Sequence, residues 1–167
     1  MGSEMCIRDS TRVAADAKAV SVTAVPPRES ITMQGNADQL LSAVVNLVEN
    51  AVKYSDTGDR VTVGAALEAT GSRATIGTNS TPGPCVEIRV QDTGQGIPQR
   101  DLDRIFERFY RVDRSRDAET GGTGIGLSIV RHVALNHGGS VSVHSFEGEG
   151  STFTISLPVI EPATMEE

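Results

Sequence analysis

Two asparagines and a lysine share one stripe of an expected helix in the segment NLVENAVKYS, residues 46–55. Asn46 and Asn50 are one helical turn apart, Lys53 follows on the same stripe, and apolar residues cover the opposite face. Asparagine is a weak helix former, so a purely solvated stripe would favour alanine, glutamate or lysine. Amide oxygens suit a hard cation such as Mg²⁺, and an ammonium group suits phosphate. The stripe therefore indicates either a magnesium and phosphate site or an ordinary solvated face.

A glycine cluster at residues 121–126 is the second candidate for phosphate binding. It leads into an expected helix near Ile125, whose first N–H groups and positive dipole end favour anions. The cluster is not a P-loop, because no Lys-Ser/Thr pair follows the glycines. It is not a dinucleotide fingerprint either, because a charged loop precedes it where that motif needs a strand. Taken alone, the cluster is equally compatible with a flexible linker.

The segment DTGQGIP, residues 92–98, combines a carboxylate with two glycines at the end of an alternating strand. The Asp92 carboxylate could accept a hydrogen bond from an exocyclic amine such as that of adenine. Gly94 and Gly96 would let a planar ring approach the backbone without a Cβ in the way. Considered alone, the segment favours a simpler interpretation, a turn in which Asp92 accepts from its own backbone.

Aromatic and basic side chains alternate in FERFYRVD, residues 106–113. Phe106, Phe109 and Tyr110 are expected to anchor a loop on the core, and Arg108 and Arg111 could meet phosphate. The alternative is a plain helix with one apolar face.

Hydrophobic periodicity predicts the elements that position these segments. A helix is expected over Leu40–Tyr54 with Asp38 as its cap, another from Ile125 to the glycines at 138–139, and a short one over Gln99–Phe109. Strands are expected at 20–25, 61–67, 85–92, 140–146 and 151–159. These elements predict a two-layer α/β domain, with one sheet that has helices on one face.

Composition narrows the function classes. The 167 residues suffice for one domain, and 22 acidic against 15 basic side chains disfavour a nucleic-acid partner. No apolar run approaches the roughly 20 residues of a membrane span, so no membrane contact by these residues is expected. Cys6 and Cys85 lack metal-ligand spacing and predict free thiols in a reducing compartment. The three histidines do not predict a metal centre or a nucleophile.

The chain is expected to divide into three parts. Residues 1–10 resemble a tag or foreign segment, 11–160 form the domain, and 161–167 form a polar tail. The polar loop Ala69–Pro84 lies outside all the motifs above and is expected to be functionally neutral.

In this order, NLVENAVKYS, DTGQGIP, FERFYRVD, GGTGIGL and GEGSTF resemble the N, G1, F, G2 and final glycine motifs of the catalytic ATP-binding domain of sensor histidine kinases. The resemblance runs from about Asp38 to Pro158. ERFYRVD resembles the histidine-kinase branch of the superfamily shared with gyrase, Hsp90 and MutL, and the detail is most similar to actinobacterial phosphate-sensing kinases. The resemblance implies a Bergerat fold, which has a mixed, mostly antiparallel sheet. It also implies that ATP is held between the first helix and a lid over about 97–121.

The resemblance also implies a role for each matching residue. Asn50 is implied as the Mg²⁺ ligand, with Asn46 and Lys53 as catalytic residues near the phosphates. Tyr54 is implied beside the adenine and Asp92 as the reader of its amine. The other implied nucleotide-binding residues, with the two arginines as weaker phosphate candidates, are Gly94, Gly96, Ile97, Arg108, Arg111, Gly122, Thr123, Gly124, Ile125, Gly126 and Leu127.

The family's phosphoacceptor, a histidine followed by an acidic residue, does not precede the first motif in this sequence. The resemblance therefore implies that the chain binds Mg-ATP and donates the γ-phosphoryl to a histidine on a separate dimerisation hairpin, with a response regulator downstream. It implies a cytoplasmic domain of a kinase anchored at the inner face of the cell membrane. The family has further structure before residue 20, which predicts that part of the sheet is missing here.

Three alternatives share the expected pocket. An anti-sigma-type serine kinase lacks a segment comparable to FERFYRVD. A gyrase-like hydrolase normally has a glutamate where Asn46 stands, and asparagine cannot take a proton from water. A non-catalytic nucleotide-binding interaction module would keep the pocket and transfer nothing.

Overall fold

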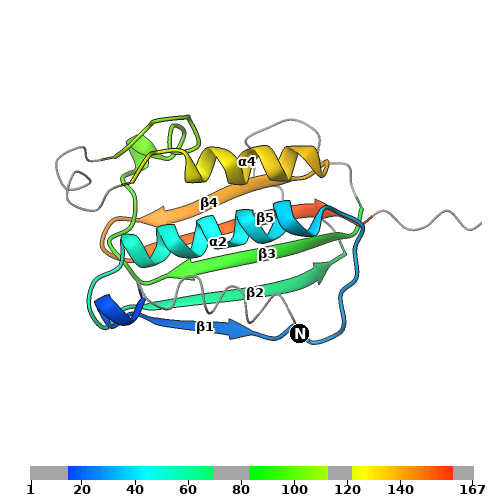
Figure 1. The fold of residues 1–167 in the computed structure, drawn as a ribbon, viewed down its shortest axis with the longest axis horizontal. Helices are drawn as coiled ribbons and strands as arrows, with labels where there is room; N and C mark the ends of the chain where they lie inside the picture. The colour runs from blue at the N-terminus through cyan, green and yellow to red at the C-terminus, as the bar shows by residue number, and fades with distance from the viewer. Residues whose placement is uncertain (1–14, 70–82, 113–121, 160–167) are drawn as a thin grey trace, which may run out of the picture.

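Five strands form one mixed sheet in the order β1-β2-β3-β5-β4 (Figure 1). The computed structural model describes residues 15–69, 83–112 and 122–159. β1 pairs in parallel with β2, and the remaining neighbours pair antiparallel, as predicted for a mostly antiparallel sheet. The strands are β1 Ser21–Val25, β2 Arg60–Glu68, β3 Cys85–Asp92, β4 Ser140–Phe146 and β5 Gly150–Pro158.

Two helices cover one face of this sheet (Figure 1). α2, Ala37–Lys53, packs on β2 and β3, and α4, Gly126–Asn136, packs on β4 and β5 and against α2. The helices run antiparallel, because Asn46 lies beside Gly126 while the backbone N–H of Asn36 donates to His137 Nε2 at 3.0 Å. The predicted two-layer α/β architecture is confirmed.

The apolar face of α2 supplies the centre of the core. Its residues face buried side chains of β2, β3 and β5, whose alternate positions point toward the helices. Phe106 joins this core from the FERFYRVD segment and meets Phe153 edge to face, with ring centroids 6.2 Å apart. The buried residues of α2 are Ala43, Val44, Leu47, Val48, Ala51 and Val52.

The predicted start of α2 is wrong. The helix begins at Ala37 rather than Leu40, and its N-cap is Asn36 rather than Asp38. Asn36 has an extended backbone, and its side-chain oxygen accepts from the N–H of Gln39 at 3.0 Å. Asp38 lies inside the first turn, where its negative charge interacts favourably with the positive end of the helix dipole.

The predicted helix Gln99–Phe109 is also wrong. Only η1, Gln99–Asp101, is a 3₁₀ turn, and successive turns follow it. Most backbone bonds there join residues three apart, such as Arg104 N–H to the Asp101 carbonyl, and Phe109 has a positive φ of 64°. A left-handed residue ends any helix that reaches it.

Three predicted segments fall on parts of the chain outside the described residues. They are the foreign segment 1–10, the tail 161–167 and most of the Ala69–Pro84 loop. The expectation that part of the sheet is missing before residue 20 also depends on residues outside this range. Within the described ranges, no helix is long and apolar enough to cross a membrane.

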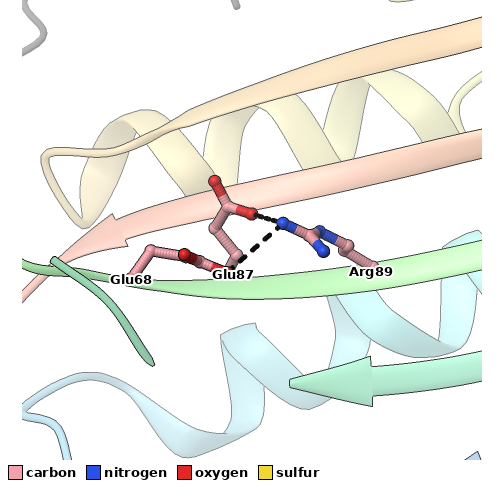
Figure 2. A network of polar contacts seen from close by, with 3 residues as sticks. All are labelled: Glu68, Glu87 and Arg89. Carbon is pink, nitrogen blue, oxygen red and sulfur yellow. Dashed lines mark hydrogen bonds and ion pairs between the residues drawn. The ribbon is translucent and has the colours of Figure 1, made fainter. Parts of the chain in front are cut away.

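A charged network occupies the sheet face turned away from the helices. Glu87 on β3 is only 1% exposed, and Arg89 pairs with its carboxylate (Figure 2). The same guanidinium lies 3.5 Å from a carboxylate oxygen of Glu68. A buried carboxylate needs a partner of opposite charge. Because this pair lies on the face of the sheet turned away from the helices, it is separate from the motifs on the helical side.

Truncating Leu47 tests the core described here. Leu47 is 1% exposed between α2 and the sheet, so L47A should lower the free energy of unfolding by about 2–5 kcal/mol. The matched control is L135A on α4, where the side chain is 49% exposed and a change within about 0.5 kcal/mol is expected. Chemical denaturation of both variants measures the difference, and equal losses would contradict this assignment of the core.

Candidate functional site

Asn46 brings the first motif into contact with the glycine cluster. Its Nδ2 donates to the Ser42 carbonyl, one turn earlier, at 2.8 Å. Its Oδ1 lies 3.0 Å from the position that a Cβ would occupy on Gly126, the first residue of α4. An amide oxygen therefore faces the N-terminal end of α4, where N–H groups of the first turn lack partners within the helix.

Lys53 and Arg111 converge on Gly122 and form what we call the cationic corner. A Cβ on Gly122 would lie 2.1 Å from Lys53 Nζ and 3.6 Å from a guanidinium nitrogen of Arg111. Lys53 Nζ also lies 4.9 Å from the ring centroid of Tyr54. Two cations beside one glycine create a positive potential that attracts a polyanion. Three motifs far apart in sequence thus meet at one edge of the helical layer.

The DTGQGIP loop is attached to the end of α2. The N–H of Gln95 donates to the Tyr54 carbonyl at 3.2 Å, and a Cβ on Gly94 would lie 2.5 Å from the same oxygen. Asp92 is 6% exposed, and its Oδ1 accepts from the N–H of Gly94 at 2.9 Å. The turn that the sequence allowed is confirmed, and Gly94 is needed because the backbone of α2 comes so close. The reading of adenine by Asp92 stays a prediction.

The carboxyl group of Asp92 sits in an environment that disfavours its charge. Desolvation by burial raises its pKa above the ordinary value of 3.8, and the N–H groups of Gly94 and Ser151 oppose this by donating to it. The charge of Asp59 raises the pKa further. Ionising a buried carboxyl group of this kind lowers the stability of the ligand-free protein. Carboxyl groups with a shifted pKa are typical of functional sites.

Gly96 docks the same loop on the β4–β5 hairpin. It has a φ of 70°, and a Cβ there would lie 1.9 Å from the carbonyl oxygen of Phe146. The N–H of Ile97 donates to Ser145 Oγ at 2.8 Å, and the N–H of Gly148 donates to the Gln95 carbonyl at 2.7 Å. These contacts explain why a glycine is required at position 96. The position of Gly96 beside a nucleotide stays a prediction.

The aromatic anchors are only partly as predicted. Phe106 is 4% exposed in the core, and the Tyr110 hydroxyl donates to Asp101 Oδ1 at 2.5 Å. Phe109 is not an anchor, because it is 68% exposed. Its N–H donates to the Gly124 carbonyl at 2.9 Å, and its left-handed backbone turns the side chain outward. Asp101, which holds Tyr110 and is itself buried, was missed because no motif marks it.

The other predicted site residues come from α2, from the start of α4 and from the FERFYRVD segment. Asn50 is half-buried on α2, one turn after Asn46, and Ile125 is the N-cap residue of α4. Leu127 packs partly buried against the core, and Thr123 and Arg108 are exposed. Gly124 has a φ of 69°, and a Cβ there would lie 3.0 Å from the Cα of Phe109.

The donor set fits a magnesium nucleotide. Mg²⁺ in proteins is usually held by one or two oxygen ligands together with substrate phosphates and water. Asn46 and Asn50 offer two amide oxygens on one stripe beside α4, with the cationic corner a further turn along α2.

Residues 35–161 match the family described as histidine kinase-, DNA gyrase B-, and HSP90-like ATPase. The sensor-like histidine kinase SenX3 of Mycolicibacterium smegmatis is 44% identical over 147 residues, which cover 88% of this chain and 34% of that protein. The phosphate regulon sensor protein PhoR of Pseudomonas aeruginosa is 37% identical over 147 residues, covering 88% of this chain and 29% of that protein. The chain thus spans about a third of the length of these relatives.

Solved structures share the fold. The mycobacterial sensor histidine kinase MprB matches with a TM-score of 0.67 and 27% identity, over 95% of this chain and 97% of that one. Full-length ShkA in complex with AMPPNP matches with a TM-score of 0.72 and 25% identity, over 98% of this chain and 30% of that one.

A pH series on D92N tests the environment of Asp92. Because the pKa of Asp92 is raised on folding, the folded protein binds this proton more tightly than the unfolded chain does. The free energy of unfolding should therefore fall as pH rises from the ordinary aspartate range through the raised pKa, and D92N should lack this fall. Chemical denaturation of both proteins between about pH 3.5 and about pH 7 measures the difference. A wild-type advantage that stays constant or grows with pH would contradict the assignment.

Alanine at Gly122 tests the cationic corner. Its Cβ would meet the mobile end of Lys53, so the fold should tolerate G122A while Lys53 is displaced. ATP affinity should fall about tenfold or more, with little change in melting temperature. In G124A, the left-handed φ and the nearby backbone of Phe109 should instead destabilise the fold by about 1–2 kcal/mol. Calorimetric titration and thermal unfolding separate the two effects, and unchanged affinity in G122A would argue against the corner.

Proposed function

Because the chain belongs to the histidine kinase-, DNA gyrase B-, and HSP90-like ATPase family and is an ATP-binding catalytic domain of the sensor histidine kinase type, we propose that it holds Mg-ATP at the α2–α4 edge. Within the intact protein it donates the γ-phosphoryl to a histidine on a separate dimerisation hairpin. The observation that carries this proposal is the convergence of Asn46 on Gly126 and of Lys53 and Arg111 on Gly122.

The adenine lies beside Asp92 and Tyr54 in this proposal. A carboxylate has two oxygens with several acceptor positions, so Asp92 can accept from the adenine amine while Oδ1 keeps the Gly94 N–H. Burial makes that hydrogen bond worth more, because water competes for it less. Tyr54 is the C-cap residue of α2, and its carbonyl accepts from Gln95 of the DTGQGIP loop, so its ring is offered beside the base.

The phosphates lie along the stripe of α2. Asn50 would hold Mg²⁺, which would offset negative charge on the phosphoryl oxygens when bound, and Asn46 would lie near the phosphates. Lys53 and Arg111 contact phosphate oxygens from the cationic corner, and the N-terminal end of α4 adds its dipole. The ShkA structure, which contains AMPPNP, supports a nucleotide in this fold.

Transfer by this domain depends on placement and charge stabilisation. Phosphoryl transfer needs little covalent chemistry from the protein when the nucleophile is held in line. Asn46 cannot act as a base toward water, so hydrolysis is slow and the γ-phosphoryl is kept for a partner histidine. Alone, the domain binds Mg-ATP and transfers little.

The intact protein is proposed to be a two-component sensor kinase anchored at the inner face of the cell membrane. Its partners are the histidine-bearing hairpin of the same kinase and a downstream response regulator. The naming of relatives such as SenX3 and PhoR as sensors supports this assignment, and the PhoR name supports a phosphate-related signal.

Removing the amide of Asn50 tests the proposal. N50A should abolish the magnesium-dependent part of ATP binding, because the ligand oxygen is lost while the helix keeps its packing. The matched control is N136A, which removes an exposed asparagine from the end of α4. It should bind as the wild type does. Calorimetry with ATP, with and without Mg²⁺, gives the comparison.

Transfer itself is tested by adding a purified histidine-bearing hairpin and labelled ATP to the same proteins. Phosphate that appears on the imidazole, is acid-labile and depends on Asn50 is the expected result. Phosphate on the serine of an anti-sigma antagonist would favour a serine kinase, and brisk hydrolysis would favour a gyrase-like ATPase. A folded wild type without magnesium-dependent binding would refute the proposal outright.

A further inference from the structure

Lys18 reaches the C-terminal end of α2 from a distant part of the chain. Its Nζ lies 2.5 Å from the Lys53 carbonyl oxygen and 3.4 Å from the carbonyl oxygens of Val52 and Ser55. Lys18 is half-buried at the end of the helical turn 15–18, just before β1. One ammonium group therefore donates to three carbonyls at the C-terminal end of the helix.

The neighbouring carbonyls show why this contact matters. The Asn50 carbonyl accepts from the N–H of Tyr54 at 3.1 Å, and the Ala51 carbonyl accepts from Ser55 Oγ at 2.7 Å. The Tyr54 carbonyl accepts from Gln95, as described above. Lys18 supplies the donor for the Lys53 and Ser55 carbonyls. The last carbonyls of a helix need such partners, and a cation there also offsets the negative end of the dipole.

The chain around Lys18 is held firmly. The N–H of Val20 donates to the Ala15 carbonyl at 3.0 Å, and the N–H of Gly58 donates to the Ala19 carbonyl at 3.2 Å. Ala19 has a φ of 54°, a left-handed conformation that alanine disfavours. Such a conformation persists only where surrounding contacts impose it, and here it ends the helical turn directly after Lys18.

We propose that Lys18 is a positioning residue for the nucleotide site. It fixes the last turn of α2, which carries Lys53 of the cationic corner and leads into Tyr54. Through the Tyr54 carbonyl it also fixes the DTGQGIP loop that holds Asp92. This inference rests on the proposed function, because it assigns Lys18 an effect on Mg-ATP binding without direct contact with the nucleotide.

Three variants of the whole chain separate positioning from plain stabilisation. K18M removes the donor and the charge, K18R keeps both, and V20A removes core packing from the same segment, since Val20 is 5% exposed. V20A is chosen because it lowers stability while leaving the capped carbonyls intact. Melting temperature, Mg-ATP affinity by calorimetry and the amide NMR shifts of Tyr54 and Gln95 are measured for each.

K18M is expected to weaken Mg-ATP binding about tenfold and to shift both amides, while K18R and V20A stay within about twofold to threefold of the wild type. Wild-type affinity in K18M, or an equal loss in V20A, would overturn the inference. Should K18M fail to fold, K18Q, which keeps a donor without the charge, is judged by the same comparison with V20A. A folded wild type that fails to bind Mg-ATP would instead refute the proposed function, and this inference with it.

Discussion

The burial of α2's apolar face against the sheet is the constraint on which the site depends. A helix rotates by about 100° per residue, so fixing the side with Leu47 and Val48 against the sheet also fixes where every other side chain points. Asn46, Asn50 and Lys53 must then lie along the opposite stripe. The antiparallel packing of α4 brings its glycine-rich start to that stripe. Packing of the core thereby orients these three polar side chains, although they contribute little to the packing themselves.

Hydrogen bonds at the end of α2 hold the start of β1 and the DTGQGIP loop in place, which the core alone would not do. The carbonyls of this last turn are shared among Lys18, Gln95 and Ser55. Each partner comes with its own segment, so satisfying the backbone also fixes the start of β1 and the DTGQGIP loop beside the helix. Buried backbone groups require partners, and this requirement links stability to the shape of the site.

Two features of this edge oppose the stability of the free domain. Asp92 is buried with a raised pKa, and Phe109 is exposed on a left-handed backbone. Each costs free energy that other contacts of the fold must offset. On the far face of the sheet, the buried carboxylate of Glu87 is paired with Arg89.

The sequence alone determined the strands, the polar stripe of α2 and the order of the glycine motifs, because these depend on local periodicity and residue type. The N-cap Asn36 and the turns after Gln99 escaped prediction, since propensity separates neighbouring candidates by only a few tenths of a kcal/mol. Only the tertiary structure decided that Glu87 is buried, that Phe109 points outward and that Lys18 serves α2. Those outcomes depend on contacts between residues far apart in the chain, and no local pattern encodes which partner a side chain will meet.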